Sequence, residues 1–562
     1  MLKVSIKLKK NNLVVILIIF FFTSLKSNQI IFEKKQLPTN QFSNYLSEFG
    51  NEGEDLKVWN EIFFDKSLED IKIFMNYLPS KSSSSVIQDI VFKFLSSKKK
   101  LSRNVVDLDD DQEIFELYIK KLFETGRINE IELFYSQSPD LKDNEFILKK
   151  MIEGNLLRNR HKEACKILRN KTNYTPDVFG KVIIICDILN SKFDEAKLGL
   201  SLLKEQNKPG DIFFIDLAYS LMSEENISES DSLKKNLEEI KTLNPIIMSS
   251  LQFADISPSY EQIENLDTSG LLFILSNPSV DTDLKIFCSE ILVKQGRIGI
   301  DMLSEAYQLS RFKNRDIENA LKLYKTLSPA KARPLLYQSI LREKDNENKS
   351  KKIIALLKIS ENDNLLKAVS KLVSDLLPKN FENFKKDDAL ITSKMYQSIQ
   401  NFFMAESVLD VVEELENDTE ILFQSISITV CKFINGESIN MRELENKLEK
   451  IKEKGKIDFE KFNKIIMVMI LNFDFSQKIK NILSSSEFLI AEKNPENLQS
   501  LFLANSFSTQ NDLFNSLIIF FKINSENDFE DLNLIENYQV LMILKNLGFK
   551  KELKELSESI LL

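Results

Sequence analysis

Gly126-Arg127-Ile128-Asn129-Glu130-Ile131 is the first copy of a six-residue pattern that returns as Asn159-Arg160-His161-Lys162-Glu163-Ala164 and as Ser191-Lys192-Phe193-Asp194-Glu195-Ala196. Each copy has a turn-forming residue first, a bulky apolar or ring-bearing residue third, Glu fifth and an apolar residue sixth. The copies begin 33 and 32 residues apart, which is the period of stacked helical hairpins. Because a single hairpin cannot cover its own apolar face, the period predicts an all-α superhelical array, an α-solenoid.

Glycine and proline are scarce, with 13 and 12 in 562 residues, which favours helices joined by short connections. Helical periodicity begins at Trp59, after an expected extended lead-in over 28–58. We expect an N-terminal helical-repeat region over 59–243 and a C-terminal one over 283–562. Between them, Pro245, Pro258 and Pro278 interrupt short helical pieces, because each disfavours helix at the residue before it. The segment 244–282 is therefore predicted to be a bend in the array.

The N-terminus has the composition of an export signal. Four lysines between Lys3 and Lys10 precede an apolar run, Leu13–Phe22, and a short polar stretch follows it. This order predicts a signal peptide over 1–27 and an exported, periplasmic protein. An uncleaved helix that anchors the chain in the inner membrane is the alternative. No later segment has the length and apolarity of a membrane span, so none is expected after cleavage.

The chain is acidic. Removal of residues 1–27 takes away five lysines and no acid, so the formal charge moves from −9 to −14. Nucleic-acid phosphates are contacted by clustered lysines and arginines, and a nucleic-acid partner is therefore not expected.

Four cysteines, Cys165, Cys186, Cys288 and Cys431, lie far apart among apolar residues. This setting favours buried free thiols. A bridge between Cys165 and Cys186 remains open if their helices are neighbours in an oxidising compartment. One histidine in the whole chain and the absence of ligand spacing argue against a metal site.

Ser191, Phe193, Glu195, Ala196 and Leu200 resemble the tetratricopeptide repeat, which has small, aromatic, acidic, alanine and bulky residues at these places. The resemblance covers about 113–210 and implies helical hairpins over 113–136, 144–169 and 177–205. The tryptophan and the Leu-Gly pair of that family's first helix are missing, so other helical-hairpin repeats remain open.

A second resemblance concerns the order of segments. An export signal, a helix led by Trp59, Leu78-Pro79, the broken segment Ala254–Pro278 and the stretch Leu284–Tyr307 resemble an uncharacterised family of exported, all-helical alphaproteobacterial proteins. The resemblance implies a Gram-negative periplasm and no particular activity.

Catalytic constellations are not evident. Serine or cysteine catalysis with an imidazole base would depend on His161, which stands where Ile128 and Phe193 stand in the sister copies. We therefore assign His161 a packing role. No phosphate-binding glycine loop is present, and no cofactor is expected. The residues of the pattern are structural: Gly126, Ile128, Glu130, Asn159, His161, Glu163, Ala164, Ser191, Phe193, Glu195 and Ala196.

The expected function is non-enzymatic. An exported array of hairpins would present a concave face to a protein or peptide of the cell envelope, as a binding or scaffolding module. One alternative is a peptidoglycan-binding helical ring, similar to the superhelix of lytic transglycosylases without their catalytic domain. The other is a glycan-cleaving enzyme that relies on a glutamate acid; Glu437-Ser438 occurs, but without the glycine-rich surroundings of that domain.

Overall fold

The computed structural model describes residues 50, 56–99, 108–137, 141, 144–169, 175–206, 208, 211–223, 231–412, 418–453, 458–472, 498–526, 529 and 532–562. These residues form thirty α-helices and two short 3₁₀ helices and include no β-strand. The all-α prediction is confirmed. The expected signal peptide over 1–27 and nearly all of the expected lead-in over 28–58 lie outside the described residues.

The helices of the first half are α3 (Lys57–Asn60), α4 (Leu68–Tyr77), α5 (Ser85–Ser96), α6 (Leu108–Glu124), α7 (Ile128–Gln137), α8 (Glu145–Leu157), α9 (His161–Arg169), α10 (Pro176–Leu189), α11 (Phe193–Glu205), α12 (Ile212–Ser223), α13 (Asp231–Glu238), α14 (Pro245–Phe253), α15 (Tyr260–Glu264) and α16 (Thr268–Ser276). The three hairpins expected over 113–205 are the pairs α6/α7, α8/α9 and α10/α11, and their bounds agree closely with the prediction.

The helices of the second half are α17 (Thr282–Lys294), α18 (Ile300–Leu309), α19 (Asn314–Glu318), α20 (Ala320–Leu323), η5 (Tyr324–Thr326), α21 (Pro329–Arg342), α22 (Asn346–Glu361), α23 (Leu366–Val373), η6 (Ser374–Leu376), α24 (Lys386–Ser398), α25 (Phe402–Asp410), α26 (Thr419–Ile434), α27 (Met441–Glu453), α28 (Phe459–Asn472), α30 (Leu498–Thr509), α31 (Leu513–Glu526), α32 (Leu534–Asn546) and α33 (Lys550–Ile560). Consecutive helices again pack as pairs, for example α21/α22 and α24/α25.

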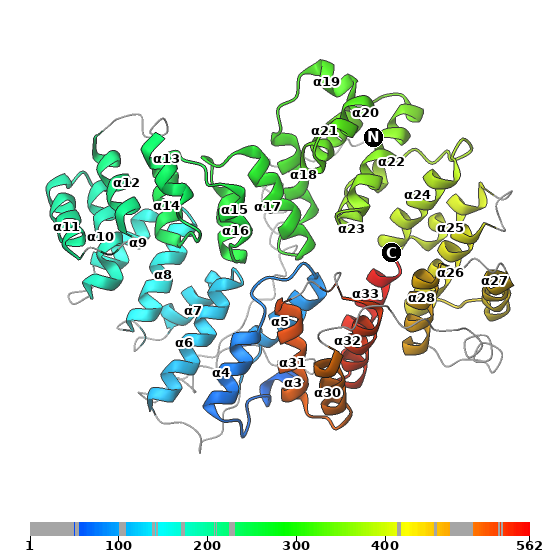
Figure 1. Cartoon of the computed structure of the whole chain (residues 1–562), viewed down its shortest axis with the longest axis horizontal. Helices are drawn as coiled ribbons and strands as arrows, with labels where there is room; N and C mark the ends of the chain where they lie inside the picture. Colours follow the sequence, from blue (N-terminus) through cyan, green and yellow to red (C-terminus); the bar gives the residue numbers. More distant parts are fainter. Residues whose placement is uncertain are drawn as a thin grey trace, which may run out of the picture.

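The segment 244–282 does more than join two halves. Its helices α14 and α16 pack against four helices of the preceding array, α6, α8, α10 and α12 (Figure 1). Pro245 is the first residue of α14, a position that suits proline because the helix needs no N–H bond there. This segment therefore covers the face of the first array that α6, α8, α10 and α12 form. The proline pattern did not predict this contact.

A buried ionic cluster joins the helices at the start of the second half. The Glu290 carboxylate on α17 accepts hydrogen bonds from Arg333 Nε at 2.7 Å and Nη2 at 2.6 Å, and from the Tyr307 hydroxyl at 2.8 Å. Arg333 on α21 also pairs with Asp363. Each of these charges has an opposite or polar partner, which offsets the cost of burying it, and the cluster connects α17, α18 and α21.

The two ends of the described chain pack together. The Trp59 ring stacks on Phe549 with ring centroids 5.4 Å apart, and Phe74 stacks on Phe514 at 5.5 Å. Helix α31 packs against α4 and helix α33 packs against α5 (Figure 1). Large aromatic side chains of both ends therefore share one core, and the array closes on itself instead of ending in two free faces.

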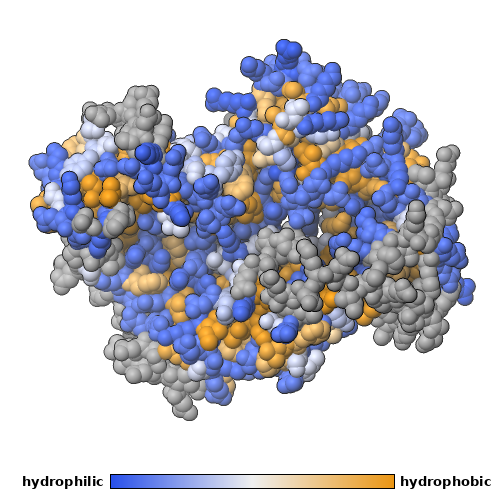
Figure 2. All heavy atoms as spheres, viewed as in Figure 1, coloured by the Kyte–Doolittle hydropathy of each residue, from blue (hydrophilic) through white to orange (hydrophobic). Residues whose placement is uncertain are grey.

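The surface is mixed. Figure 2 shows hydrophilic residues over most of the visible face, with hydrophobic residues gathered along the lower edge, where the first and last helices meet. Within the described ranges, no helix has the length and apolarity needed to cross a membrane.

Candidate functional site

The three copies of the sequence pattern form the same turn. Their first residues have left-handed backbones, with φ of 76° at Gly126, 58° at Asn159 and 57° at Ser191. The next N–H then donates to the carbonyl five residues back, for example from Arg127 to Leu122 at 2.8 Å. This is the Schellman arrangement, in which a left-handed residue ends one helix and satisfies its last carbonyls.

The same turn occurs at seven further places in the described residues. Their left-handed residues are Asp255, Gly296, Asn364, Gln400, Gly436, Asn511 and Gly548, and each following N–H donates to the carbonyl five positions back. Gly296 and Gly548 are recognisable in the sequence because only glycine enters this conformation freely. Asp255, Asn364, Gln400, Gly436 and Asn511 were missed because the Glu at the fifth position of the pattern is replaced at all five turns.

Most of the other pattern residues lie in helix interfaces or in the first turn of a helix. Ile131, Ala164 and Ala196, at the sixth position, are fully buried, where a compact side chain brings paired helices together. Ile128 lies against Gly154 of α8, where a Cβ atom would collide with it. Glu130, Glu163 and Glu195 lie in the first turns of α7, α9 and α11, where a carboxylate complements the exposed N–H groups. Phe193 is partly exposed on α11.

His161 connects the first array to the segment that covers it. Its Nε2 lies 3.1 Å from the Ser249 hydroxyl and its ring centroid lies 4.4 Å from that of Phe253, both on α14. Burial lowers the pKa of the imidazole. These contacts are consistent with a packing role for His161.

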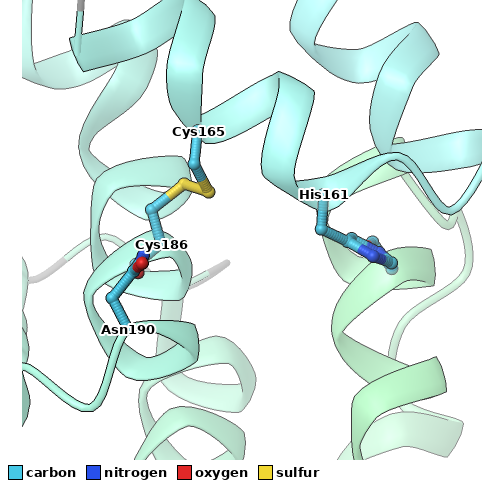
Figure 3. The surroundings of a disulfide bond; sticks show 5 residues. His161, Cys165, Cys186 and Asn190 are labelled. Atoms are coloured by element: carbon cyan, nitrogen blue, oxygen red, sulfur yellow. A yellow bond between two sulfur atoms is a disulfide. The ribbon is translucent and has the colours of Figure 1, made fainter.

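Cys165 on α9 and Cys186 on α10 form a disulfide with 5.6 Å between their Cα atoms. Figure 3 shows the bond joining the two helices, with His161 one turn earlier on α9 and directed away from it. The expectation of free thiols is wrong for this pair, because α9 and α10 are spatial neighbours. Cys288 and Cys431 are buried free thiols, as expected, and burial raises their pKa.

A cleft of about 610 Å³ lies where the covering segment meets the first array. Its apolar floor includes Phe123, Phe146, Met248 and Leu266, contributed by α6, α8, α14 and the α15–α16 connection. Its polar lining adds the four charged side chains Lys120, Glu124, Lys150 and Asp267. The cleft therefore combines an apolar surface with charges of both signs.

The charged groups of the cleft are held in place by local contacts. Lys150 Nζ bonds Glu153 at 2.8 Å and lies 4.4 Å from the centre of the Phe123 ring. Asp267 caps α16 by accepting from the Gly270 N–H and the Ser269 hydroxyl, each at 2.8 Å. Burial, with a smaller contribution from the charge of Glu124, raises the pKa of Asp267 despite these bonds. Asp267 is thus explained as a helix cap.

Within the described residues, no group of three or more His, Cys, Asp or Glu side chains is arranged to hold a metal ion. Comparisons of the chain with protein-family models, with curated proteins and with solved structures found no match. The site is therefore argued from its own residues.

The left-handed turn makes a prediction for Ser191. Glycine enters this conformation without the steric cost that serine pays, so Ser191→Gly is expected to raise the free energy of unfolding by about 0.5–1 kcal/mol. The matched control is Ser201→Gly on the exposed face of α11, where glycine should lower it by about 0.5 kcal/mol. Denaturant unfolding measures both. Equal effects of the two changes would contradict the assigned turn.

His161 makes a prediction for pH. The folded pKa lies below the unfolded value of about 6.5, so the unfolded chain takes up the proton first as the pH falls. Stability is therefore full above pH 6.5 and decreases below it, as the pH falls through the folded pKa. His161→Phe introduces the residue that stands at this place in the third copy of the pattern, Phe193. It should remove the loss of stability that the wild type shows between pH 7 and 5.5. Because the chain has one histidine, proton NMR follows its titration directly, and a folded pKa at or above 6.5 would refute the assignment.

Proposed function

We propose that this chain is an exported, non-enzymatic protein-binding scaffold of the cell envelope, and that the cleft between α6, α8 and α14–α16 receives a peptide segment of its partner. The observation that carries the proposal is the composition of this cleft. A concave, largely apolar floor with a few fixed polar groups is the usual form of a binding site.

The size and chemistry of the cleft suit a peptide. Its volume of about 610 Å³ accommodates a few side chains and not a folded domain. Phe123, Phe146 and Met248 offer contacts to apolar side chains, while Lys150 and Glu124 face a peptide that carries either sign of charge. The backbone of an extended peptide would find a partner in the exposed side chain of Asn265 at the same site.

Two observations support a location outside the cytoplasm. The N-terminal sequence has the order of a signal peptide. The Cys165–Cys186 disulfide belongs to an oxidising compartment, since cytosolic thiols are kept reduced. Together they favour export, and the periplasm is the compartment that the resemblance of segment order implies.

A peptidoglycan-binding ring is the second candidate. It is favoured by the closure of the array through Trp59, Phe549 and the contacts of α31 with α4. A carboxylate-dependent glycan-cleaving enzyme is not favoured by any contact in the cleft, where the buried carboxylate of Asp267 caps a helix.

Photo-crosslinking tests the proposal. A photoreactive amino acid at Asn265, an exposed residue of the cleft, is compared with one at Phe403, which is 77% exposed on α25 outside the cleft. In the native cell envelope, the Asn265 probe should capture a defined protein partner that the Phe403 probe does not.

Charge reversal supplies the control. Lys150→Glu should reduce the crosslink at least tenfold, because it replaces a cation beside Phe123 with an anion. Lys149→Glu, on the neighbouring residue that does not line the cleft, should leave it unchanged. Equal yields from both probes would overturn the proposal, and co-sedimentation of the mature chain with purified murein sacculi, without a protein crosslink, would establish the second candidate instead.

A further inference from the structure

A second cavity, of about 440 Å³, lies at the centre of the molecule. It is lined by the start of α5, the α17–α18 turn, the α22–α23 turn and the C-terminal helix α33. Figure 1 shows α5, α17, α23 and α33 around this central region. The cavity exists only because the array closes, since these elements come from the two ends and the middle of the chain.

One wall of the cavity is basic. Lys294 at the end of α17 and Lys367 and Lys371 on α23 line it, and none of the three forms an ion pair with another described residue. Lys367 and Lys371 are four residues apart and so share a helix face. The helix starts at Ile300 and Leu366 reach the same wall, and neither has a side-chain cap. Their unsatisfied N–H groups add partial positive charge to that of the lysines.

The opposite wall is acidic. Glu558 of α33 is only 9% exposed, and its carboxylate accepts from Gln400 Nε2 at 3.0 Å and from Asn435 Nδ2 at 2.5 Å, both neutral amides. The other two carboxylates in the lining are paired with cations: Glu361 with Lys394 at 2.5 Å and Glu555 with Lys551 at 3.7 Å. Among the described residues, no cation is paired with Glu558.

We propose that this central cavity binds a short zwitterionic peptide, with its carboxylate against Lys294, Lys367 and Lys371 and its ammonium group against Glu558. A purely anionic ligand would be repelled by Glu558, and a purely cationic one by the three lysines. Apolar side chains between the walls, among them Val293 and Phe529, face the middle of such a peptide. The volume lies within the range of about 300–1,000 Å³ that is usual for small-ligand sites.

This site is separate from the cleft and takes a small ligand, so it goes beyond the proposed scaffold function. The same ligand chemistry has two sources, a free oligopeptide or the peptide branch of a cell-wall fragment. The two sources differ in the amino end of the peptide. A free oligopeptide has a terminal ammonium group, whereas a cell-wall branch is attached through its amino end and must supply a side-chain amine instead.

Isothermal titration calorimetry of the mature full-length chain tests the proposal. The probes are trialanine, N-acetyl-trialanine, trialanine amide and a soluble muropeptide whose peptide branch carries a side-chain amine. We expect trialanine or the muropeptide to bind and trialanine amide to bind at least tenfold more weakly than trialanine. N-acetyl-trialanine should also bind at least tenfold more weakly than trialanine. Binding of the muropeptide alone identifies the cell-wall source, and binding of trialanine alone identifies the free peptide.

Variants connect the binding to the two walls. Lys367→Ala with Lys371→Ala should weaken binding at least tenfold, and these exposed residues can be changed without loss of the fold, as circular dichroism will verify. Glu558→Gln should abolish the preference for trialanine over its N-acetyl form. Lys313→Ala, at an exposed lysine outside the cavity, is the matched control and should have no effect. The proposal would be overturned if neither trialanine nor the muropeptide gave a heat of binding. It would also be overturned if binding did not change with the terminal groups of the peptide or with the lysine substitutions. Neither result depends on the crosslinking at Asn265.

Discussion

Every hairpin in this chain has more apolar surface than its own two helices can cover, and the fold follows from how that surface is buried. In the first array, α14 and α16 return across the inner face of α6, α8, α10 and α12. At the other end, the aromatic side chains of α31, and Phe549 just before α33, join those of α3, α4 and α5, where Phe74 is in ring contact with Phe94, Phe514 and Phe521. The closure leaves neither end of the array with an uncovered hairpin.

Closure also determines where ligands can bind. The inner face that an open array would present to a partner is partly occupied by the chain's own segment 244–282, and what remains is the cleft beside Lys150 and Asp267. The central cavity arises in the same way, where the turns at Gly296 and Asn364 meet α33. Both candidate sites lie where separate parts of the chain meet: the cleft depends on the packing of 244–282 on the first array, and the central cavity depends on closure.

The sequence was informative where the physical signal is local. The turns at Gly126, Asn159 and Ser191 were predictable because a turn-forming residue, a bulky or ring-bearing residue two positions later, Glu four positions later and an apolar residue five positions later occur together within six residues. The packing role of His161 followed from the same alignment of copies. The turn at Gln400 was not predictable, because glutamine rarely adopts a positive φ and gives no signal of it.

Long-range contacts left no such signal. The prolines between 245 and 278 indicated broken helices but not that these helices lie on the preceding array. The bridge between Cys165 and Cys186 depended on which helices are neighbours, which the spacing of 21 residues alone does not decide. The candidate sites could not be predicted at all, since Lys371 and Glu558 acquire a shared environment only through closure.

Closure is tested most directly by zero-length crosslinking. Lys551 and Asp89 are both more than half exposed, lie 462 residues apart in the sequence, and are separated by 3.4 Å between Nζ and Oδ2. A carbodiimide, which joins only amines and carboxylates in direct contact, should link the peptides that contain them in the monomeric fraction. Lys386 and Asp418, 2.9 Å apart within the second half, provide the internal control. A crosslink between Lys386 and Asp418 without one between Lys551 and Asp89 would show that the ends of the array do not meet and would contradict the account.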